Sequence, residues 1–457
     1  MDPTTPRLAW FSPLPPARTG VASVSADLLD QLRPAYHIDA FVDARLRQGS
    51  GGQASTAPPG TCARSAHDFV WLHLKHPYDL VVYQLGNSAE HEYIWPYLFR
   101  YPGLTVLHDA HVHHARAAAL LRHRRADDYR AEFAANHPGV NADLAEIGVA
   151  GFDSHLYYQW PMIQLVLATS RLTLVHTPAI ARSIRDAMLD VHIESVRLGH
   201  GRPVSADEAA RHRQEIRHRY DISPEAILFG CFGGLAPEKR IPQILRAFAA
   251  LHAYEPDVRL LLAGAPARHY DLDADIRATC APGTVITTGY VPEDDELTAH
   301  IAASDVALNL RWPTAREISG PWLRSLAAGV PTVITQLAHL AGVPWLDPRT
   351  WRSSGAPASA DAVCIGIDIL DEDHSLLLAM RRLARDSALR IVLGEAGRRY
   401  WESNHTPELM AGDYRHAIEL ARSRSVPSVE LPAHLLDDGR SALKSLLTPF
   451  GTPDPLR

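Results

Sequence analysis

Short apolar runs alternate with segments of helical periodicity along the first half of the chain. The run LAWFS (8–12) stops at PLPPARTG, and VASVSADLLDQL (21–32) then carries apolar residues at helical spacing. Further runs of strand length follow at IDAFVD (38–43), DLVVYQLG (79–86), LTVLHD (104–109), RLTLVHT (171–177) and SVRLGHG (195–201). Each is almost continuously apolar, which is typical of parallel strands buried on both faces. This pattern predicts a Rossmann-like half.

A second series of the same kind follows a charged stretch at 205–225. Its strand-like runs are AILFGCFG (226–233), VRLLLAGA (258–265), VITTGYV (285–291), VALNLRW (306–312) and PTVITQ (331–336). Helix-periodic segments separate them, as at IPQILRAFAALHA (241–253), ELTAHIAAS (296–304) and PWLRSLAAG (321–329). This alternation predicts a second doubly wound parallel sheet. We therefore predict an α/β fold of two Rossmann-like domains that face each other across a cleft.

The expected domain boundaries follow from this pattern. At 457 residues the chain is too long for one hydrophobic core. We expect one domain over 1–200, a second over 201–395, and helices from 396 that cross back to the first domain. The polar, small-residue segment 45–61 is expected to be a mobile loop. The sequence does not place the tail at 424–457.

Composition and charge narrow the class of protein. The net charge of −7 argues against a general nucleic-acid binder, which needs a basic face. Four well-separated cysteines without a CxxC pair fit reduced thiols in a cytoplasmic protein. The N-terminus does not resemble a signal peptide, and no apolar run approaches the roughly 18 residues of a membrane span. We therefore expect a cytoplasmic location.

A glycine-rich turn follows the first strand of the second series, in FGCFGGLAPEKRIPQIL (229–245). Gly233 and Gly234 allow close approach of a ligand to the backbone, and Lys239 lies at the start of the next helix. Backbone N–H groups, a helix dipole and a lysine together suit a diphosphate. The pattern is neither a Walker A motif nor GxGxxG, so a plain strand-to-helix turn remains an equal alternative.

The stretch LNLRWPTAREISGPWLRSLAAGVPTVI (308–334) carries more information. A strand is expected to end at Arg311, and Gly320 and Pro321 begin a helix. Helix capping and helix initiation explain the glycine and the proline, but they do not explain Arg311 and Glu317 at the edge of the sheet. We expect Glu317 to accept hydrogen bonds from sugar hydroxyls, and the amides near Trp322 to contact a phosphate.

These motifs, together with PLPPARTGVASVSADLL and GYVPEDDELTAHIAASDVALNLRWP, resemble the retaining glycosyltransferases of glycosyltransferase family 4, which have the GT-B fold. The resemblance extends over roughly residues 8–420. It implies that Glu317 and His108 face the donor sugar, that Lys239 and Gly20 lie at the donor diphosphate, and that Tyr290 and Val291 lie at the nucleotide base. Besides these residues, we expect the helix start at Gly320, Pro321 and Trp322 to contact the diphosphate, and Gly233 and Gly234 to approach the nucleotide. We expect Arg18, Asp109 and His111 on the acceptor side.

The chain departs from the family pattern at two positions. Gly234 stands where the family has a phosphate-binding arginine, and Ser325 stands where it has a second glutamate that contacts ribose. We expect Arg311 to assist Lys239 in place of the missing arginine. Ribose binding is expected to lack a hydrogen bond or two, each worth about 1 kcal/mol net.

The histidine-rich run VLHDAHVHH (106–114) has several interpretations. His108, His111, His113 and His114 are of the type that ligates zinc, but the run lacks the metallohydrolase arrangement HxHxDH. A polar wall of the active site and structural histidines are the alternatives. The acidic stretches DLDAD (271–275) and EDDE (293–296) are interpreted as helix caps. We therefore expect no metal site.

The segment HARAAALLRHRRADDYRAEF (114–133) is rich in arginine and is expected to form one basic helix. Such a helix suits peripheral contact with an anionic membrane or an acidic acceptor, while a solvated surface helix is the more common case.

The function expected from these observations is metal-independent, retaining transfer of a sugar from a nucleotide-diphosphate sugar, with UDP or GDP as nucleotide. The acceptor is expected to be a glycan or a glycolipid, on family analogy. No cofactor is expected. The alternatives are a metal-dependent hydrolase centred on His108–His114 and a nucleotide-sugar-binding protein without activity. The oligomeric state is not indicated.

Overall fold

The computed structural model describes residues 5–43, 62–151, 156–188, 191–355, 361–437 and 440–451. The chain divides into two compact units, of which the first comprises 1–196 and 414–457 and the second 197–413. The first change of unit lies close to the expected boundary at residue 200. The segment 396–457 is divided between the units, because helix α17 (Ser387–Asn404) packs against helix α15 (Gly320–Ala327) of the second unit.

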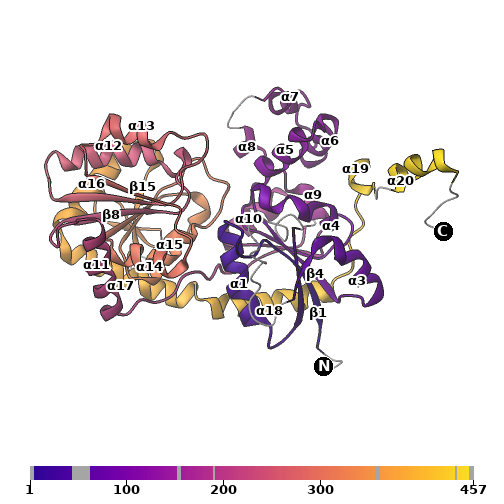
Figure 1. Cartoon of the computed structure of the whole chain (residues 1–457), viewed down its shortest axis with the longest axis horizontal. Helices are drawn as coiled ribbons and strands as arrows, with labels where there is room; N and C mark the ends of the chain where they lie inside the picture. Colours follow the sequence, from indigo (N-terminus) through magenta and orange to yellow (C-terminus); the bar gives the residue numbers. More distant parts are fainter. Residues whose placement is uncertain are drawn as a thin grey trace. The chain divides into compact units, whose positions relative to one another are not determined.

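The first unit is built on a seven-stranded parallel sheet with the order β3-β2-β1-β4-β5-β6-β7 (Figure 1). Its strands are β1 (Arg7–Phe11), β2 (His37–Val42), β3 (Cys62–Ser65), β4 (Leu80–Leu85), β5 (Leu104–Leu107), β6 (Leu172–Val175) and β7 (Ile193–Ser195). Strands β1, β4, β5 and β6 are apolar and buried almost throughout, as expected for strands covered on both faces. The direction of winding reverses between β1 and β4, which is where doubly wound sheets bind ligands.

The first unit also contains helices. They are α1 (Gly20–Leu32), α3 (Phe69–Lys75), α4 (Trp95–Leu98), α5 (His113–Arg122), α6 (Ala126–Asn136), α7 (Leu144–Val149), α8 (Leu156–Gln159), α9 (Gln164–Thr169), α10 (Pro178–Ala187), α19 (Ala433–Leu436) and α20 (Arg440–Leu447). Short 3₁₀ turns occur at η1 (Ala66–Asp68), η2 (Ala89–Ile94) and η6 (Thr448–Phe450). Helix α18 (Pro407–Ser423) contains the second change of unit.

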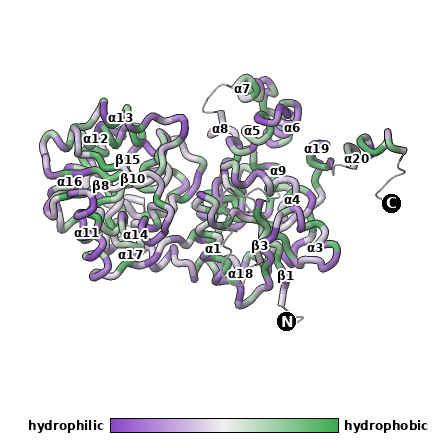
Figure 2. Tube along the Cα trace, in the orientation of Figure 1, coloured by the Kyte–Doolittle hydropathy of each residue, from purple (hydrophilic) through white to green (hydrophobic). Residues whose placement is uncertain are grey.

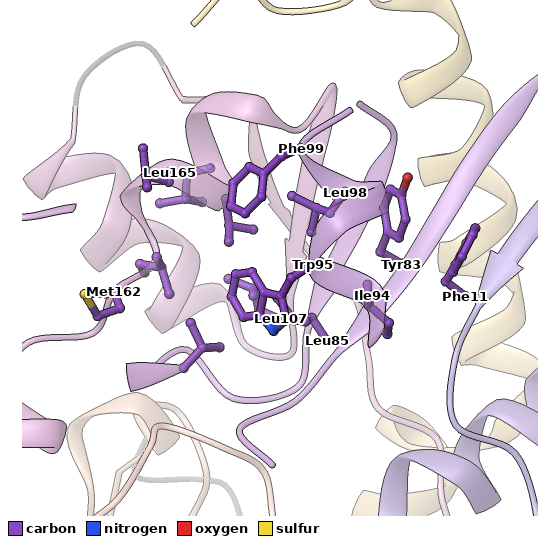
Figure 3. Close-up of a cluster of buried hydrophobic side chains, with 14 of the residues drawn as sticks. Phe11, Tyr83, Leu85, Ile94, Trp95, Leu98, Phe99, Leu107, Met162 and Leu165 are labelled. Carbon is purple, nitrogen blue, oxygen red and sulfur yellow. The ribbon is translucent and has the colours of Figure 1, made fainter. Parts of the chain in front are cut away.

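An aromatic core fills one face of the first sheet. Phe11 stacks on Phe41 with ring centroids 5.1 Å apart, and Tyr83 donates a hydrogen bond to the Tyr97 carbonyl. Trp95 lies in the same cluster, together with aliphatic side chains of β4, β5 and α9 (Figure 3). This core fixes the strands from whose carboxyl ends the histidine-rich loop departs.

The second unit is built on an eight-stranded sheet with the order β10-β9-β8-β11-β12-β15-β13-β14. Its strands are β8 (Ile227–Phe232), β9 (Val258–Ala263), β10 (Val285–Gly289), β11 (Val306–Asn309), β12 (Thr332–Thr335), β13 (Trp345–Leu346), β14 (Ser353–Ser354) and β15 (Cys364–Ile367). The pairs are parallel except for β13 with β14. Here the winding reverses between β8 and β11.

Helices cover both faces of this sheet. They are α11 (Ala206–Arg219), α12 (Ile241–His252), α13 (Leu272–Thr279), α14 (Asp294–Ala303), α15, α16 (Glu372–Arg385) and α17, with 3₁₀ turns η3 (Pro237–Lys239), η4 (Ala338–Leu340) and η5 (Ile369–Asp371). Neighbouring residues of β8 pack into different clusters, since Phe229 packs with α12 and Phe232 with α14. Figure 2 accordingly shows hydrophobic residues concentrated along the central strands of each unit.

Three sequence-based predictions of elements are corrected: the strand at 195–201, the end of the strand at 306–312 and the single helix at 114–133. Residues 196–201 are not a strand, because β7 ends at Ser195, and β11 ends at Asn309 rather than Arg311. The charged stretch at 205–225 contains helix α11, whose buried Arg217 pairs with Asp305 at 2.7 Å. The arginine-rich segment 114–133 is two helices rather than one, α5 and α6. The predicted mobile loop at 45–61 lies outside the described residues.

Candidate functional site

The loops after β8 and β11 lie side by side at the reversal of winding in the second sheet, because these two strands are neighbours. One loop carries Gly233, Gly234 and Lys239, and the other carries Arg311 and Glu317. Ligands of doubly wound sheets bind at this place. The residues that the sequence indicated for the donor site are therefore brought to one edge of one sheet.

Lys239 is folded back over the glycine turn. Its Nζ donates a hydrogen bond of 2.7 Å to the Phe232 carbonyl at the end of β8. Burial, with a smaller contribution from the nearby Arg311 guanidinium, lowers the pKa of Lys239 to about 8, while Cys231 and Glu317 oppose the shift. The lysine is still mostly charged at neutral pH, and an anion bound beside it would raise this pKa again.

Gly233 makes this arrangement possible. Its φ of +83° lies in the left-handed region, which side chains rarely adopt. A Cβ here would lie 2.9 Å from Lys239 Nζ and 3.3 Å from Pro321 Cγ at the start of α15. The ammonium group, the glycine turn and the first turn of α15 therefore meet at one point.

Helix α15 begins with most of its first amides already engaged. Ser319 is the N-cap, and its side chain accepts a hydrogen bond from the Trp322 N–H at 3.4 Å, while the Leu323 N–H donates to the Ser319 carbonyl at 3.2 Å. Pro321 has no N–H. Within the described residues, the Gly320 N–H is the amide of this turn without a partner, whereas the Trp322 N–H is engaged by the Ser319 cap.

The carboxylate of Glu317 is held by two neighbours. Thr314 Oγ1 donates to Oε2 at 2.9 Å, and Arg311 Nε lies 2.5 Å from Oε1. The contact with Arg311 is an ion pair and not an aligned hydrogen bond. Oε1 accordingly has no hydrogen-bond partner among the described residues. His339 donates through Nε2 to the Glu317 carbonyl at 3.2 Å, and burial lowers the pKa of His339.

Beside this carboxylate lies a cavity of about 30 Å³. Its polar lining comes from Asn309, Arg311, Glu317, Ser319, Thr335 and His339, and apolar side chains including Trp322 close the rest. The Asn309 Nδ2 atom is buried and has no hydrogen-bond partner in the described part of the chain. Two unsatisfied polar atoms therefore border one small cavity.

The two departures from the family pattern are plain in the structure. Ser325 is fully buried, and its hydroxyl donates to the Pro321 carbonyl at 2.8 Å within the helix. Gly234 is exposed, and no atom lies within 4 Å of the place where its Cβ would be. Nothing described fills the space of an arginine at 234. Arg311 lies near Lys239 but is paired with Glu317.

Tyr290 and Val291 follow β10, which is separated from β8 by β9. Tyr290 is 43% exposed. Neither residue lines the cavity beside Glu317. The structure thus places these two predicted nucleotide contacts at the same edge of the sheet, but on a different strand from the Lys239 and Glu317 group.

The histidine-rich loop of the first unit has a different character. His108 is buried, and its Nε2–H donates to Gln84 Oε1 at 2.7 Å. Its Nδ1 accepts from His176 Nε2 at 3.1 Å, and Gln84 Oε1 also accepts from the Tyr414 hydroxyl at 3.3 Å. Burial, with the neighbouring His176 and His91, holds the pKa of His108 well below its ordinary value. Both ring nitrogens of this neutral histidine are therefore used inside the first unit.

The other residues predicted for the first unit lie on loops at the carboxyl end of its sheet. The Asn87 N–H donates to the Asp109 carboxylate at 2.7 Å, and the Asn87 side chain accepts from the Ala115 N–H at the start of α5. His111 is buried after β5, and Arg18 is exposed after β1. Gly20 begins α1, with open space where a Cβ would be.

The histidines after His111 belong to the core of the first unit. His113 is buried and shares a hydrogen bond of 2.9 Å with the Tyr129 hydroxyl, and His114 packs on Tyr157. Across the described ranges, no group of three or more His, Cys, Asp or Glu side chains is arranged to hold a metal ion. The hydrolase alternative is therefore not favoured.

The arginines of 114–133 are largely neutralised by carboxylates. Arg116 is buried, pairs with Glu132 and lies over the Trp95 ring. The other recorded pairs are Arg122 with Glu92, Arg125 with Asp128, and Arg130 with Asp127 and Glu146. The segment is therefore not the uniformly basic face that a membrane contact would use.

Sequence reasoning missed five residues that hold these groups in place: Gln84, His176, Asn309, Thr314 and His339. The expected strand ended at Arg311, two residues after Asn309. The sequence therefore did not indicate that Asn309 is the last residue of its strand. Gln84 and His176 are polar residues at the ends of apolar runs, which was the available signal.

Comparison with known proteins agrees with this geometry. Residues 226–345 match the family model described as glycosyl transferases group 1. No curated protein sequence matches the chain. Among solved structures, sucrose-phosphate synthase from Thermosynechococcus elongatus is similar with a TM-score of 0.61 at 15% identity, covering 91% of this chain and 98% of that one.

Two further structures are similar over almost the whole chain. The Anabaena protein Alr3699/HepE, in complex with UDP and glucose, has a TM-score of 0.59 at 12% identity and covers 90% of this chain and 99% of its own. A glycosyltransferase from Rickettsia africae has a TM-score of 0.61 at 11% identity and covers 92% and 100%. The similarity confirms the predicted GT-B fold, and the family match confirms the predicted glycosyltransferase. No described helix is long and apolar enough to cross a membrane.

Proposed function

We propose that the chain transfers a sugar, with retention at the anomeric carbon and without a metal ion, from a UDP- or GDP-sugar to a glycan or lipid-linked acceptor. The observation that carries this proposal is the meeting of Lys239, the Gly233 turn and the first turn of α15, with Glu317 in the neighbouring loop. A lysine and a helix N-terminus offer positive charge and N–H donors to a diphosphate. The complex of a similar structure with UDP and glucose supports this choice of donor.

In the proposed reaction the oxygen of an acceptor hydroxyl forms a bond to the anomeric carbon on the face from which the diphosphate departs. The bond between that carbon and the phosphate oxygen breaks, and its electrons stay with the diphosphate, which takes the acceptor proton. Lys239 stabilises the charge that develops on this leaving group. Glu317 orients the sugar through hydrogen bonds and forms no bond to carbon.

Three residues of the first unit are proposed to serve the acceptor. Arg18 follows β1, and Asp109 and His111 follow β5, at the edge of the sheet where doubly wound domains bind ligands. Gly20, also after β1, is proposed to lie near the donor diphosphate. His108 is proposed to hold the loop that carries Asp109 and His111. A glycan or glycolipid acceptor is proposed from family resemblance alone.

The test is a thermal-shift panel of UDP, GDP, ADP and their common sugars, with and without EDTA. A ligand that binds the folded state raises the melting temperature. We expect one nucleotide class to raise it equally in EDTA, and the shift to disappear in Lys239→Ala but persist in the surface variant Lys75→Ala. No shift with any nucleotide would overturn the proposal, and binding without transfer or slow donor hydrolysis would indicate a binding protein instead.

A further inference from the structure

Two buried polar atoms border the cavity beside Glu317, and their chemistry is complementary. Asn309 Nδ2 is a hydrogen-bond donor, and Glu317 Oε1 is an acceptor. Neither has a hydrogen-bond partner among the described residues, although both are buried and both residues line the cavity. Buried polar groups in native proteins are nearly always satisfied, so a pair of this kind calls for an explanation.

The cavity has the size of a very small group. Its volume of about 30 Å³ leaves room for one or two water-sized groups. A hydroxyl group accepts one hydrogen bond and donates one, so it can satisfy Asn309 Nδ2 and Glu317 Oε1 at the same time. A methyl group would satisfy neither atom.

Several other polar groups around the cavity already have partners. Thr335 Oγ1 accepts from the Arg311 N–H at 3.0 Å, and His339 Nε2 donates to the Glu317 carbonyl. Glu317 itself is held by Thr314 and by the ion pair between Arg311 Nε and Oε1. Asn309 Nδ2 is buried without a partner among the described residues, and Oε1 can accept a hydrogen bond in addition to its ion pair.

The position of Asn309 is fixed by the sheet. It is the last residue of β11 and is in register with Ile334 of β12, which also lines the cavity. Trp322, which is 2% exposed, closes the apolar side and is anchored through Nε1 to Thr332 at 3.1 Å. A donor held on such rigid elements distinguishes ligands by their hydrogen bonds.

We propose that this cavity receives a single hydroxyl group of the transferred sugar, and that Asn309 is a specificity-determining residue of the donor site. The proposal rests on the proposed function. The sugar hydroxyl accepts from Asn309 Nδ2 and donates to Glu317 Oε1, so a donor with a free hydroxyl at that position is selected over its deoxy counterpart. Sites built around such a hydrogen bond reject ligands that lack it, because their buried groups are left unpaired.

The experiment compares wild type with Asn309→Ala and Asn309→Asp by calorimetry. The probes are UDP, GDP, UDP-glucose, UDP-N-acetylglucosamine and GDP-mannose, followed by the monodeoxy analogues of the sugar nucleotide that binds tightest. Asn404→Ala is the matched control, because it removes an asparagine of the same unit that does not line the cavity. Melting temperatures of the ligand-free variants show that each one folds.

We expect Asn309→Ala to bind the sugar nucleotide about tenfold or more weakly and the free nucleotide as tightly as wild type. One deoxy analogue should bind wild type equally weakly, and Asn309→Ala should no longer distinguish it from the parent sugar. Asn309→Asp should bind worst, because it places a second carboxylate against Glu317.

Three results would overturn the proposal. Equal losses for free nucleotide and sugar nucleotide would make Asn309 a nucleotide contact, and unchanged affinity for both would mean that the cavity holds water only. In either case the proposed function stands. Absence of any nucleotide binding by wild type would remove the proposed function and this inference together.

Discussion

His108 of the first unit and Glu317 of the second unit are held in different ways. In the first unit, His108 has both ring nitrogens hydrogen-bonded, to Gln84 and to His176, although Gln84 Nε2 is buried without a hydrogen-bond partner among the described residues. In the second unit, Glu317 Oε1 and Asn309 Nδ2 are buried beside a cavity without hydrogen-bond partners among the described residues. Both groups are polar and at strand ends, so sequence position does not distinguish them.

The difference separates two roles. A buried ring with both nitrogens hydrogen-bonded can hold a loop in place, whereas a buried donor and acceptor beside a cavity are prepared for a ligand. On this basis we propose that Glu317 contacts substrate and that His108 positions the loop that follows it. The resemblance to known glycosyltransferases assigns both residues to the donor sugar, so the two interpretations of His108 are open to test.

Glu317→Gln is expected to give the largest effect. The amide keeps the size of the side chain but loses the charge paired with Arg311 and one acceptor for the sugar. Loss of an electrostatic contact made in the transition state costs about 100-fold in kcat. Steady-state rates with the tightest-binding sugar nucleotide would measure it, with affinity for free UDP or GDP as control. A rate within threefold of wild type would contradict the assignment.

His108→Ala is expected to act mainly on stability. The change leaves Gln84 Oε1 without its strongest donor and His176 Nε2–H without its acceptor, at a cost of about 1–3 kcal/mol for each buried group. Chemical denaturation would measure the free energy of unfolding, and the exposed His416→Ala would serve as control. Unchanged stability with lost turnover would instead place His108 against the donor.

Gly233→Ala and Gly234→Ala form a matched pair in the phosphate loop. Alanine at 233 meets a left-handed φ, which costs about 1–2 kcal/mol, and a contact with Lys239 Nζ. Alanine at 234 meets open space. We expect the first variant to lose stability and nucleotide affinity and the second to change neither. Equal effects in both would show that Lys239 does not lie over the Gly233 turn.

Most of the fold was predictable because it follows from local pattern. Buried parallel strands gave continuous apolar runs, and α1, α12 and α15 were found within one or two residues of their bounds. Short β13 and β14, of two residues each, carry no such signal. The division of 396–457 between the units depends on packing of α17 against α15, and single-sequence periodicity does not report packing partners.

The parts of the site that depend on the order of the strands could be predicted from the sequence. The contacts that depend on side-chain directions could not. Lys239 and Glu317 follow β8 and β11, which a doubly wound order makes neighbours, so their proximity could be inferred. The pairing of Arg311 with Glu317 and the burial of Asn309 Nδ2 depend on side-chain directions in loops. The sequence therefore indicated that Arg311 would supply a positive charge to the diphosphate. In the structure Arg311 forms an ion pair with the Glu317 carboxylate.

The pH dependence of Lys239 gives the smallest and most specific test of the second unit's site. Its pKa is lowered from 10.5 to about 8 in the ligand-free protein, and a bound diphosphate favours the charged form. Affinity for free UDP or GDP should therefore fall as pH rises, by about twofold between pH 7 and 8 and more steeply above pH 8.

Stability of the ligand-free protein should change in the opposite direction over the same range. Because the folded pKa lies below the unfolded one, the unfolded chain binds more protons between about pH 8 and 10.5, and this lysine's contribution to stability rises there. Lys239→Arg keeps its charge and should flatten both profiles. Affinity that stays constant to pH 9 in wild type would mean that Lys239 does not hold the diphosphate, and would leave α15 as its main contact.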